Sequence, residues 1–213
     1  MAEQAPRGRR ILRAVSDERD AFEATIRAHC AAARWSEATT DTIERYGDEV
    51  LGYLVAMTRS EVDAGDAFSL ACEELWQSLP RFRWESSLRS FIYTIARQAL
   101  GHVRRDPYRR RAVGISDAGI SDVAAQVRSR TATFLRTETR DAITALRAEL
   151  DPDDQTLLIL RVSRGLPWRE IARVLAGDEE VSDAALNRSS AALRKRFERL
   201  KSELRERARE RLS

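Results

Sequence analysis

Apolar residues recur along the chain at the three- and four-residue spacing of amphipathic helices. The 9 glycines and 5 prolines are too few for a turn-rich all-β fold. Pro80, Pro107 and Gly177 mark helix ends, whereas Asp151-Pro152 and Ser182 mark helix starts. The fold class predicted is therefore all-α, with helices over about 17–35, 42–59, 63–79, 87–105, 151–164, 167–176 and 182–209.

The periodicity weakens in one internal stretch, which divides the chain. Residues 112–136 contain two glycines and several serines and threonines, and are predicted to be a flexible linker with at most a short helix. Residues 1–16 are predicted to be a disordered basic tail. We therefore expect two small helical domains, over 17–111 and 137–213.

Composition narrows the class of function. Of 213 residues, 43% are hydrophobic and 33% are charged, which is typical of a soluble globular protein. There is no apolar run of membrane-spanning length and no apolar segment for a signal peptide, so we expect a cytoplasmic protein without membrane insertion. The sequence has only two cysteines and two histidines, and it has no Gly-rich phosphate loop. It therefore predicts a protein without a metal site, a cofactor or enzymatic activity.

The charge is informative by type and position. Only Lys195 and Lys201 of the 37 basic residues are lysines, and arginine is the residue that grips phosphates bidentately. A GC-rich genome would give the same bias, and that alternative stays open. The position of the charges is more informative. Residues 81–111 contain nine arginines and two acidic residues, and residues 186–213 contain ten basic and four acidic residues. Two separate basic surfaces are predicted.

The helix predicted over 87–105 has two contrasting faces. One is apolar and predicted to face the core, and consists of Leu88, Phe91, Ile92, Ile95, Ala99 and Val103. Arg89, Tyr93, Arg97 and Arg104 lie opposite, and an aromatic ring among arginines suits single-stranded or melted nucleic acid. A solvated arginine face with Tyr93 lying on it is the alternative. The preceding loop adds Phe82 and Trp84 just before a helix N-terminus.

The helix predicted over 63–79 also has an unusual face. Phe68, Cys72, Leu75 and Leu79 form its apolar side, with Cys72 as an inert core residue. Asp66, Leu70, Glu73 and Gln77 project opposite. An apolar residue ringed by acids and an amide indicates a protein contact, although a single exposed leucine is common.

The last two predicted helices form a helix-turn-helix pattern. Trp168, Ile171, Ala172 and Leu175 line the first, and Leu186, Leu193, Phe197, Leu200 and Leu204 line the second. Opposite these project Ala184, Arg188, Ala191, Lys195 and Arg199. Small residues between cations let a helix sit closely in a major groove. A coiled-coil-like helix with a solvated basic face is the alternative.

These motifs, in this order, resemble the extracytoplasmic-function (ECF) family of RNA polymerase sigma factors. Residues 63–83 are similar to the family's core-polymerase-binding helix, and 85–97 to its segment that melts and reads the minus-ten element. Leu166–Ala172 and Ser182-Asp183 resemble its minus-thirty-five helix-turn-helix. The resemblance covers roughly 41–111 and 137–204.

The resemblance implies binding to RNA polymerase core, to double-stranded and melted promoter DNA, and to an anti-sigma factor as regulator. Core polymerase would bind Asp66, Leu70, Glu73 and Gln77. The minus-ten element would meet Trp84, Ser86, Ser87, Arg89, Tyr93, Arg97, Arg104 and Arg105. The minus-thirty-five element would meet Arg169, Ala184, Asn187, Arg188, Ala191, Lys195 and Arg199.

The chain departs from the family pattern at several places. Leu70 replaces a usual acid, and Gln98 and His102 stand where the family often has Asn and Asp. The turn 177–181 is longer and carries three acids, and the segment before residue 41 has no assigned counterpart.

A second class of function fits part of the pattern. A stand-alone helix-turn-helix repressor or activator would bind a palindromic site as a dimer. It would bind closed duplex alone, whereas a sigma factor depends on polymerase. The aromatic segment 82–97 favours the sigma factor, because a repressor gives it no role.

Overall fold

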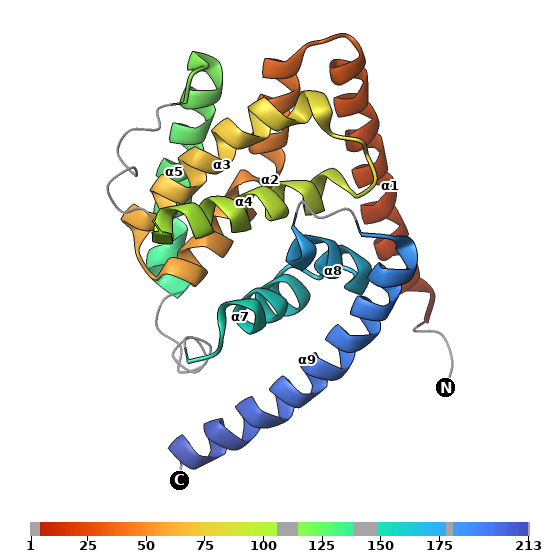
Figure 1. The fold of residues 1–213 in the computed structure, drawn as a ribbon, viewed down its shortest axis with the longest axis vertical. Helices are drawn as coiled ribbons and strands as arrows, with labels where there is room; N and C mark the ends of the chain where they lie inside the picture. Colours follow the sequence, from red (N-terminus) through yellow and green to blue (C-terminus); the bar gives the residue numbers. More distant parts are fainter. Residues whose placement is uncertain (1–4, 106–114, 139–148, 178–180, 213) are drawn as a thin grey trace.

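A computed structural model of the chain describes residues 5–105, 115–138, 149–177 and 181–212. All regular structure in these ranges is helical, as predicted (Figure 1). The elements are α1 (Ala5–Ala31), α2 (Trp35–Thr58), α3 (Glu61–Ser78), the 3-10 turn η1 (Leu79–Arg81), α4 (Leu88–Arg105), α5 (Ala118–Glu138), α7 (Pro152–Leu158), the π-helical turn η3 (Ile159–Ser163), α8 (Trp168–Ala176) and α9 (Asp183–Leu212).

Helix starts follow the capping residues visible in the sequence. The Ser60 hydroxyl accepts from the Asp63 N–H at 3.1 Å, and the Ser87 hydroxyl accepts from the Ser90 N–H at 3.1 Å at the start of α4. The Asp151 carboxylate accepts from the N–H groups of Asp153 and Asp154, both at 3.0 Å, with Pro152 at the first helical position. These caps satisfy backbone donors that have no partner within the helix.

The N-terminal segment differs from its prediction. Helix α1 begins at Ala5, so most of the tail predicted to be disordered is helical. Four arginines between residues 7 and 13 suggested a solvated tail, but arginine is a good helix former and the stretch 5–15 contains one glycine.

The segment predicted to be a linker is also largely helical. Helix α5 fills 118–138 and packs against α2 and α3. Its buried side chains are spaced at three and four residues and are Ile120, Val123, Ala124, Val127 and Thr131. This stripe was visible in the sequence, but it is short and rich in small residues, which weakens its periodic signal.

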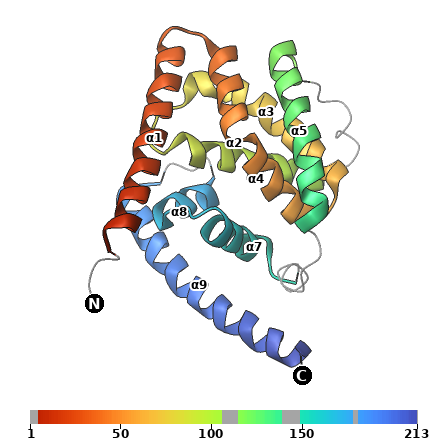
Figure 2. The same ribbon diagram turned by 180° about the vertical axis from the view of Figure 1, so that it is seen from behind.

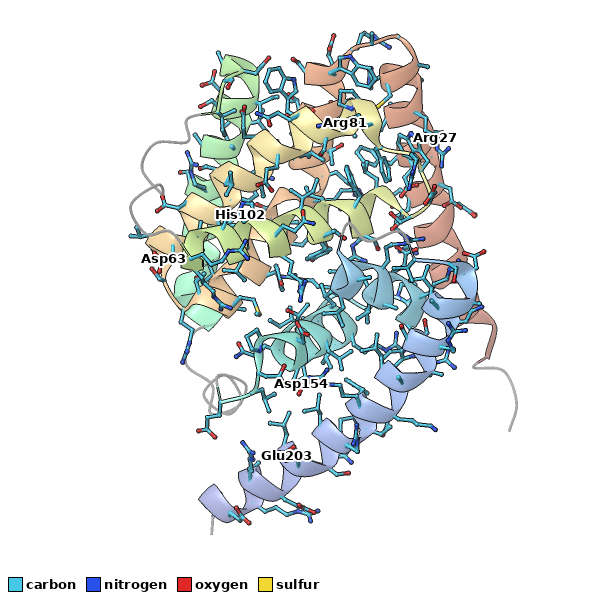
Figure 3. The ribbon with its side chains drawn as sticks, in the orientation of Figure 1. Arg27, Asp63, Arg81, His102, Asp154 and Glu203 are labelled. Atoms are coloured by element: carbon cyan, nitrogen blue, oxygen red, sulfur yellow. The ribbon has the colours of Figure 1, made fainter. Side chains whose placement is uncertain are left out.

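The described helices before residue 139 form a first block and those after residue 148 form a second block, and the two blocks share one apolar core. Helices α2, α3, α4 and α5 pack together, and α4 also packs against α8 (Figure 1). Leu157, Leu160 and Ile171, from the second block, are fully buried in the same cluster as the first block's residues. Seen from behind, α7 and α8 lie between α4 and α9 (Figure 2). The Arg196 guanidinium holds α9 to α7 by ion pairs with Asp151, at 2.9 Å, and with Asp154 (Figure 3).

The two thiols are expected to differ in reactivity. Burial raises the pKa of the Cys72 thiol to about 12, and raises that of half-buried Cys30 less. Because the thiolate is the nucleophile, Cys72 should stay unmodified by a thiol-reactive dye at pH 8 until the protein unfolds, while Cys30 reacts first. Mass spectrometry of modified peptides over time checks this order. Equal rates would show that α3 opens readily in the native protein.

Candidate nucleic-acid interface

The outer face of α9 presents its polar and small residues to solvent. Six predicted contact residues are exposed there: Ala184, Asn187, Arg188, Ala191, Lys195 and Arg199. The opposite face is buried through Leu186, Leu193 and Leu200, and Phe197 meets Trp168 of α8 edge to face at 5.4 Å. The structure therefore brings the predicted set together on one side of one helix, with small residues between the cations.

Arg169, on α8, lies at the start of this face. Its guanidinium forms an ion pair with Asp183 and donates to the Asn187 Oδ1 atom at 3.1 Å. The fork of Arg169 thereby orients the Asn187 side chain at the first turn of α9. The acidic turn noted in the sequence, 178–180, lies outside the described residues.

A second candidate surface surrounds the loop before α4. Trp84 has a φ of 60°, in the left-handed region, and its ring contacts Phe82 with centroids 4.7 Å apart. Phe82 stacks in turn on Phe91 of α4 at 4.1 Å. The aromatic cluster holds the indole of Trp84 at the surface, half-buried, beside the cap residues Ser86 and Ser87.

Helix α1 covers one side of this loop, which the sequence did not predict. The Arg27 guanidinium lies over the Trp84 ring at 4.2 Å, a cation–π contact. The Glu23 carboxylate accepts from the Leu88 N–H at 2.7 Å, at the N-terminus of α4. Burial raises the pKa of Glu23, while the Leu88 N–H and the Arg27 charge oppose that rise.

The polar face of α4 is covered rather than solvated. Arg89 is paired bidentately with Glu49, both distances 2.7 Å, and donates to the Arg164 carbonyl at 3.0 Å. Burial opposes its charge, but the hydrogen bond and the charge of Glu49 outweigh that cost and raise the pKa of Arg89. Arg97 donates to Asp153 of α7 at 2.7 Å.

Tyr93 corrects the sequence prediction most clearly. Its side chain is fully buried, edge to face with Tyr53 at 5.6 Å, instead of lying on a solvated face. Tyr93, Ala96 and Leu100 form a second buried stripe along α4, on the side where Tyr93 packs against Tyr53 of α2. Arg104 and Arg105, at the end of α4, remain exposed, and Arg104 donates to the Met57 carbonyl at 2.8 Å.

The face of α3 predicted to bind a protein is partly covered as well. Asp66 and Leu70 are half-buried and Gln77 is exposed. Glu73 is buried, contrary to the prediction that it projects outward. It accepts from the Gln77 amide at 2.7 Å and from both the N–H and the hydroxyl of Ser116 at 2.9 Å, because the segment leading into α5 folds across α3.

Within the described residues, no three His, Cys, Asp or Glu side chains gather closely enough to hold a metal ion. Nor does any described helix have the length and apolarity to cross a membrane.

Comparison with known proteins finds similarity to sigma factors. Residues 42–111 match the model for sigma-70 region 2. The chain is 28% identical to the RNA polymerase sigma factor YlaC of Bacillus subtilis (strain 168) over 175 residues, covering 78% of this chain and 96% of that protein. Both matches are to sigma-factor sequences, and they support the family resemblance drawn from the sequence motifs. No solved structure is detectably similar to it.

A sigma-factor role in transcription initiation, with RNA polymerase and promoter DNA as partners, is what these matches support. The region 2 match spans most of α2 and all of α3 and α4. It contains the aromatic loop and the α3 face, whereas α1, α8 and α9 lie outside it.

Proposed function

We propose that the two surfaces divide promoter recognition between them. The 17–111 domain binds core polymerase and melts and reads the minus-ten element, and the 137–213 domain reads the minus-thirty-five element through α9. The exposed face of α9, where small residues separate the cations, carries this proposal together with the match of 42–111 to sigma-70 region 2. The catalysis belongs to polymerase, and the sigma factor contributes binding only, in the cytoplasm where polymerase works.

The α9 face suits a major groove. Ala184 and Ala191 allow close approach of the backbone, while Arg188 can donate to guanine and Asn187 to adenine. Lys195 and Arg199, farther along, suit phosphates. Arg169 holds Asn187 in position through the 3.1 Å hydrogen bond.

Replacing Arg188 by alanine is expected to weaken holoenzyme binding to a promoter by about 1–3 kcal/mol if it reads a base. Arg205→Ala is the matched control, because Arg205 is exposed on the same helix but lies beyond the proposed contact set. Filter binding on promoters with each base of the upstream element changed measures both affinity and specificity. Equal small losses for both variants would remove Arg188 from base readout.

The aromatic loop suits a melted strand. Trp84 offers a ring for a flipped base, Ser86 and Ser87 offer hydroxyls, and Arg104 and Arg105 offer exposed cations for phosphates. Arg89 is held by Glu49 and the Arg164 carbonyl, and Arg97 by Asp153 of α7, while Tyr93 is buried against Tyr53. Their use in DNA binding requires these contacts to open.

Core polymerase is proposed to bind the α3 face of Asp66, Leu70, Glu73 and Gln77. Glu73 is bonded to Ser116, so exposing it requires the segment before α5 to detach. That movement would also release residues 112–136 as the linker toward the polymerase channel and RNA exit path. An anti-sigma factor is proposed to regulate the exposed surfaces.

Footprinting of the holoenzyme tests this division of labour. The proposal predicts DNase protection of an upstream element that disappears when α9 is altered, and permanganate-reactive thymines near minus ten that disappear when the Trp84 loop is altered. A single protected site that the free protein gives without polymerase would instead favour a stand-alone regulator.

A further inference from the structure

Besides Glu49, three carboxylates from α1, α7 and α8 contact groups that are proposed to bind promoter DNA or lie directly beside them. Glu23 of α1 accepts from the Leu88 N–H at 2.7 Å. Glu170 of α8 accepts from the Ser87 hydroxyl at 2.5 Å and from the Ser90 hydroxyl. Asp153 of α7 accepts from the Arg97 guanidinium at 2.7 Å.

A carboxylate and a phosphate are recognised by the same donors. Both accept from guanidinium forks, from hydroxyls and from the free N–H groups at a helix N-terminus. A phosphate of the melted strand and each of these carboxylates therefore compete for one set of hydrogen bonds. The places that a strand would occupy along the start of α4 are already filled by anions of the protein itself.

The base-stacking position is filled in the same way. The Arg27 guanidinium lies 4.2 Å over the Trp84 ring, where a flipped base would stack. Around them is a cavity of about 420 Å³, lined by α1, the aromatic loop and the start of α8. Glu23 and Glu170 both line this cavity.

The interface that covers α4 leaves polar groups unsatisfied. The Tyr93 hydroxyl and the Arg164 Nε atom are buried there without a hydrogen-bond partner. A buried donor without a partner costs free energy that water would return on opening. Ion pairs and charged hydrogen bonds at the edge of this interface thus stabilise it, whereas the buried polar groups without partners destabilise it. This combination is expected of an interface that opens.

From these contacts we infer that the free sigma factor is self-inhibited by anion mimicry: Glu23, Asp153 and Glu170 occupy the phosphate positions of its own minus-ten surface, and Arg27 occupies the base position. The inference rests on the proposed function of that surface. It gives the segment before residue 41 a role, because α1 supplies Glu23 and Arg27. Polymerase binding and opening of α7–α8 are then coupled.

The triple variant Glu23→Gln, Asp153→Asn, Glu170→Gln tests the inference. Glu37→Gln, Glu44→Gln, Asp122→Asn is the control, because it removes the same charge from exposed positions that do not contact the loop or α4. The probe is a fluorescein-labelled 20-nucleotide single strand of random sequence, followed by anisotropy without polymerase. Small-angle X-ray scattering reports the radius of gyration of the same samples.

The triple variant should bind the strand at least about fivefold more tightly than the control, the low end for coupling between two states. Its radius of gyration should also increase. Asp153→Asn alone, which removes one half-exposed pair at the edge, should give a smaller shift in the same direction and guards against misfolding of the triple variant. The inference would be overturned if neither variant binds the strand more tightly than the control does.

Transcription by the reconstituted holoenzyme separates this outcome from failure of the proposed function. Saturating polymerase holds the sigma factor open, so wild type and triple variant should give equal transcript yields. Normal transcription with no gain in strand binding would overturn self-inhibition alone. Promoter melting that is insensitive to the Trp84 loop would overturn the proposed function itself, and self-inhibition with it.

Discussion

Open-complex formation is expected to fall about 5- to 150-fold when Trp84 is replaced by alanine, equivalent to the loss of about 1–3 kcal/mol of base stacking. Closed-complex affinity should change little, because the upstream duplex is proposed to be bound by α9 instead. The ring is half-buried and is held at the surface by Phe82, whose own ring stacks on Phe91. Its removal therefore empties a stacking position more than it empties the core.

The measurement is the rate of permanganate reactivity near minus ten, alongside filter binding at a temperature that keeps the promoter closed. Trp84→Phe is the matched control, since it keeps an aromatic face and should retain most of the melting rate. Equal losses in closed and open complexes, or a lowered melting temperature of the free protein, would assign Trp84 to the core instead.

Replacing Tyr93 by alanine is expected to destabilise the folded protein by about 3–5 kcal/mol, as for other large buried aromatic side chains. Its ring is fully buried and lies edge to face against Tyr53 of α2. Tyr93→Phe should keep or raise stability, because the hydroxyl is buried without a hydrogen-bond partner. The pair of variants separates ring packing from hydroxyl chemistry.

Urea unfolding followed by circular dichroism gives both values. A solvated Tyr93, as the sequence pattern suggested, would make both variants nearly neutral. That result would also mean that Tyr93 does not pack against Tyr53 of α2 in solution.

Local chemistry was predictable from the sequence. Ser87 and Asp151 cap the helices where their side chains suggested, since a cap depends on residues within one turn. The exposed face of α9 was also predictable, because Arg188, Ala191 and Lys195 alternate with leucines on a single helix.

Long-range docking was not predictable from the same patterns. The apolar stripe of Leu88 and Ile92 identifies one buried side of α4, but it does not show that Tyr93 is buried against Tyr53 of α2, about forty residues earlier in the chain. Glu73 is likewise buried where it accepts from Ser116, which belongs to the segment that the sequence predicted to be a flexible linker. Periodicity reports the faces of one helix and carries no information on which distant segment covers them.

Run-off transcription with purified core polymerase on fragmented genomic DNA tests the central claim most directly. The sigma-factor assignment predicts discrete transcripts that appear only when this protein is added, and whose start sites share two upstream elements. The absence of such transcripts, together with separate elution of protein and core polymerase on a sizing column, would contradict it.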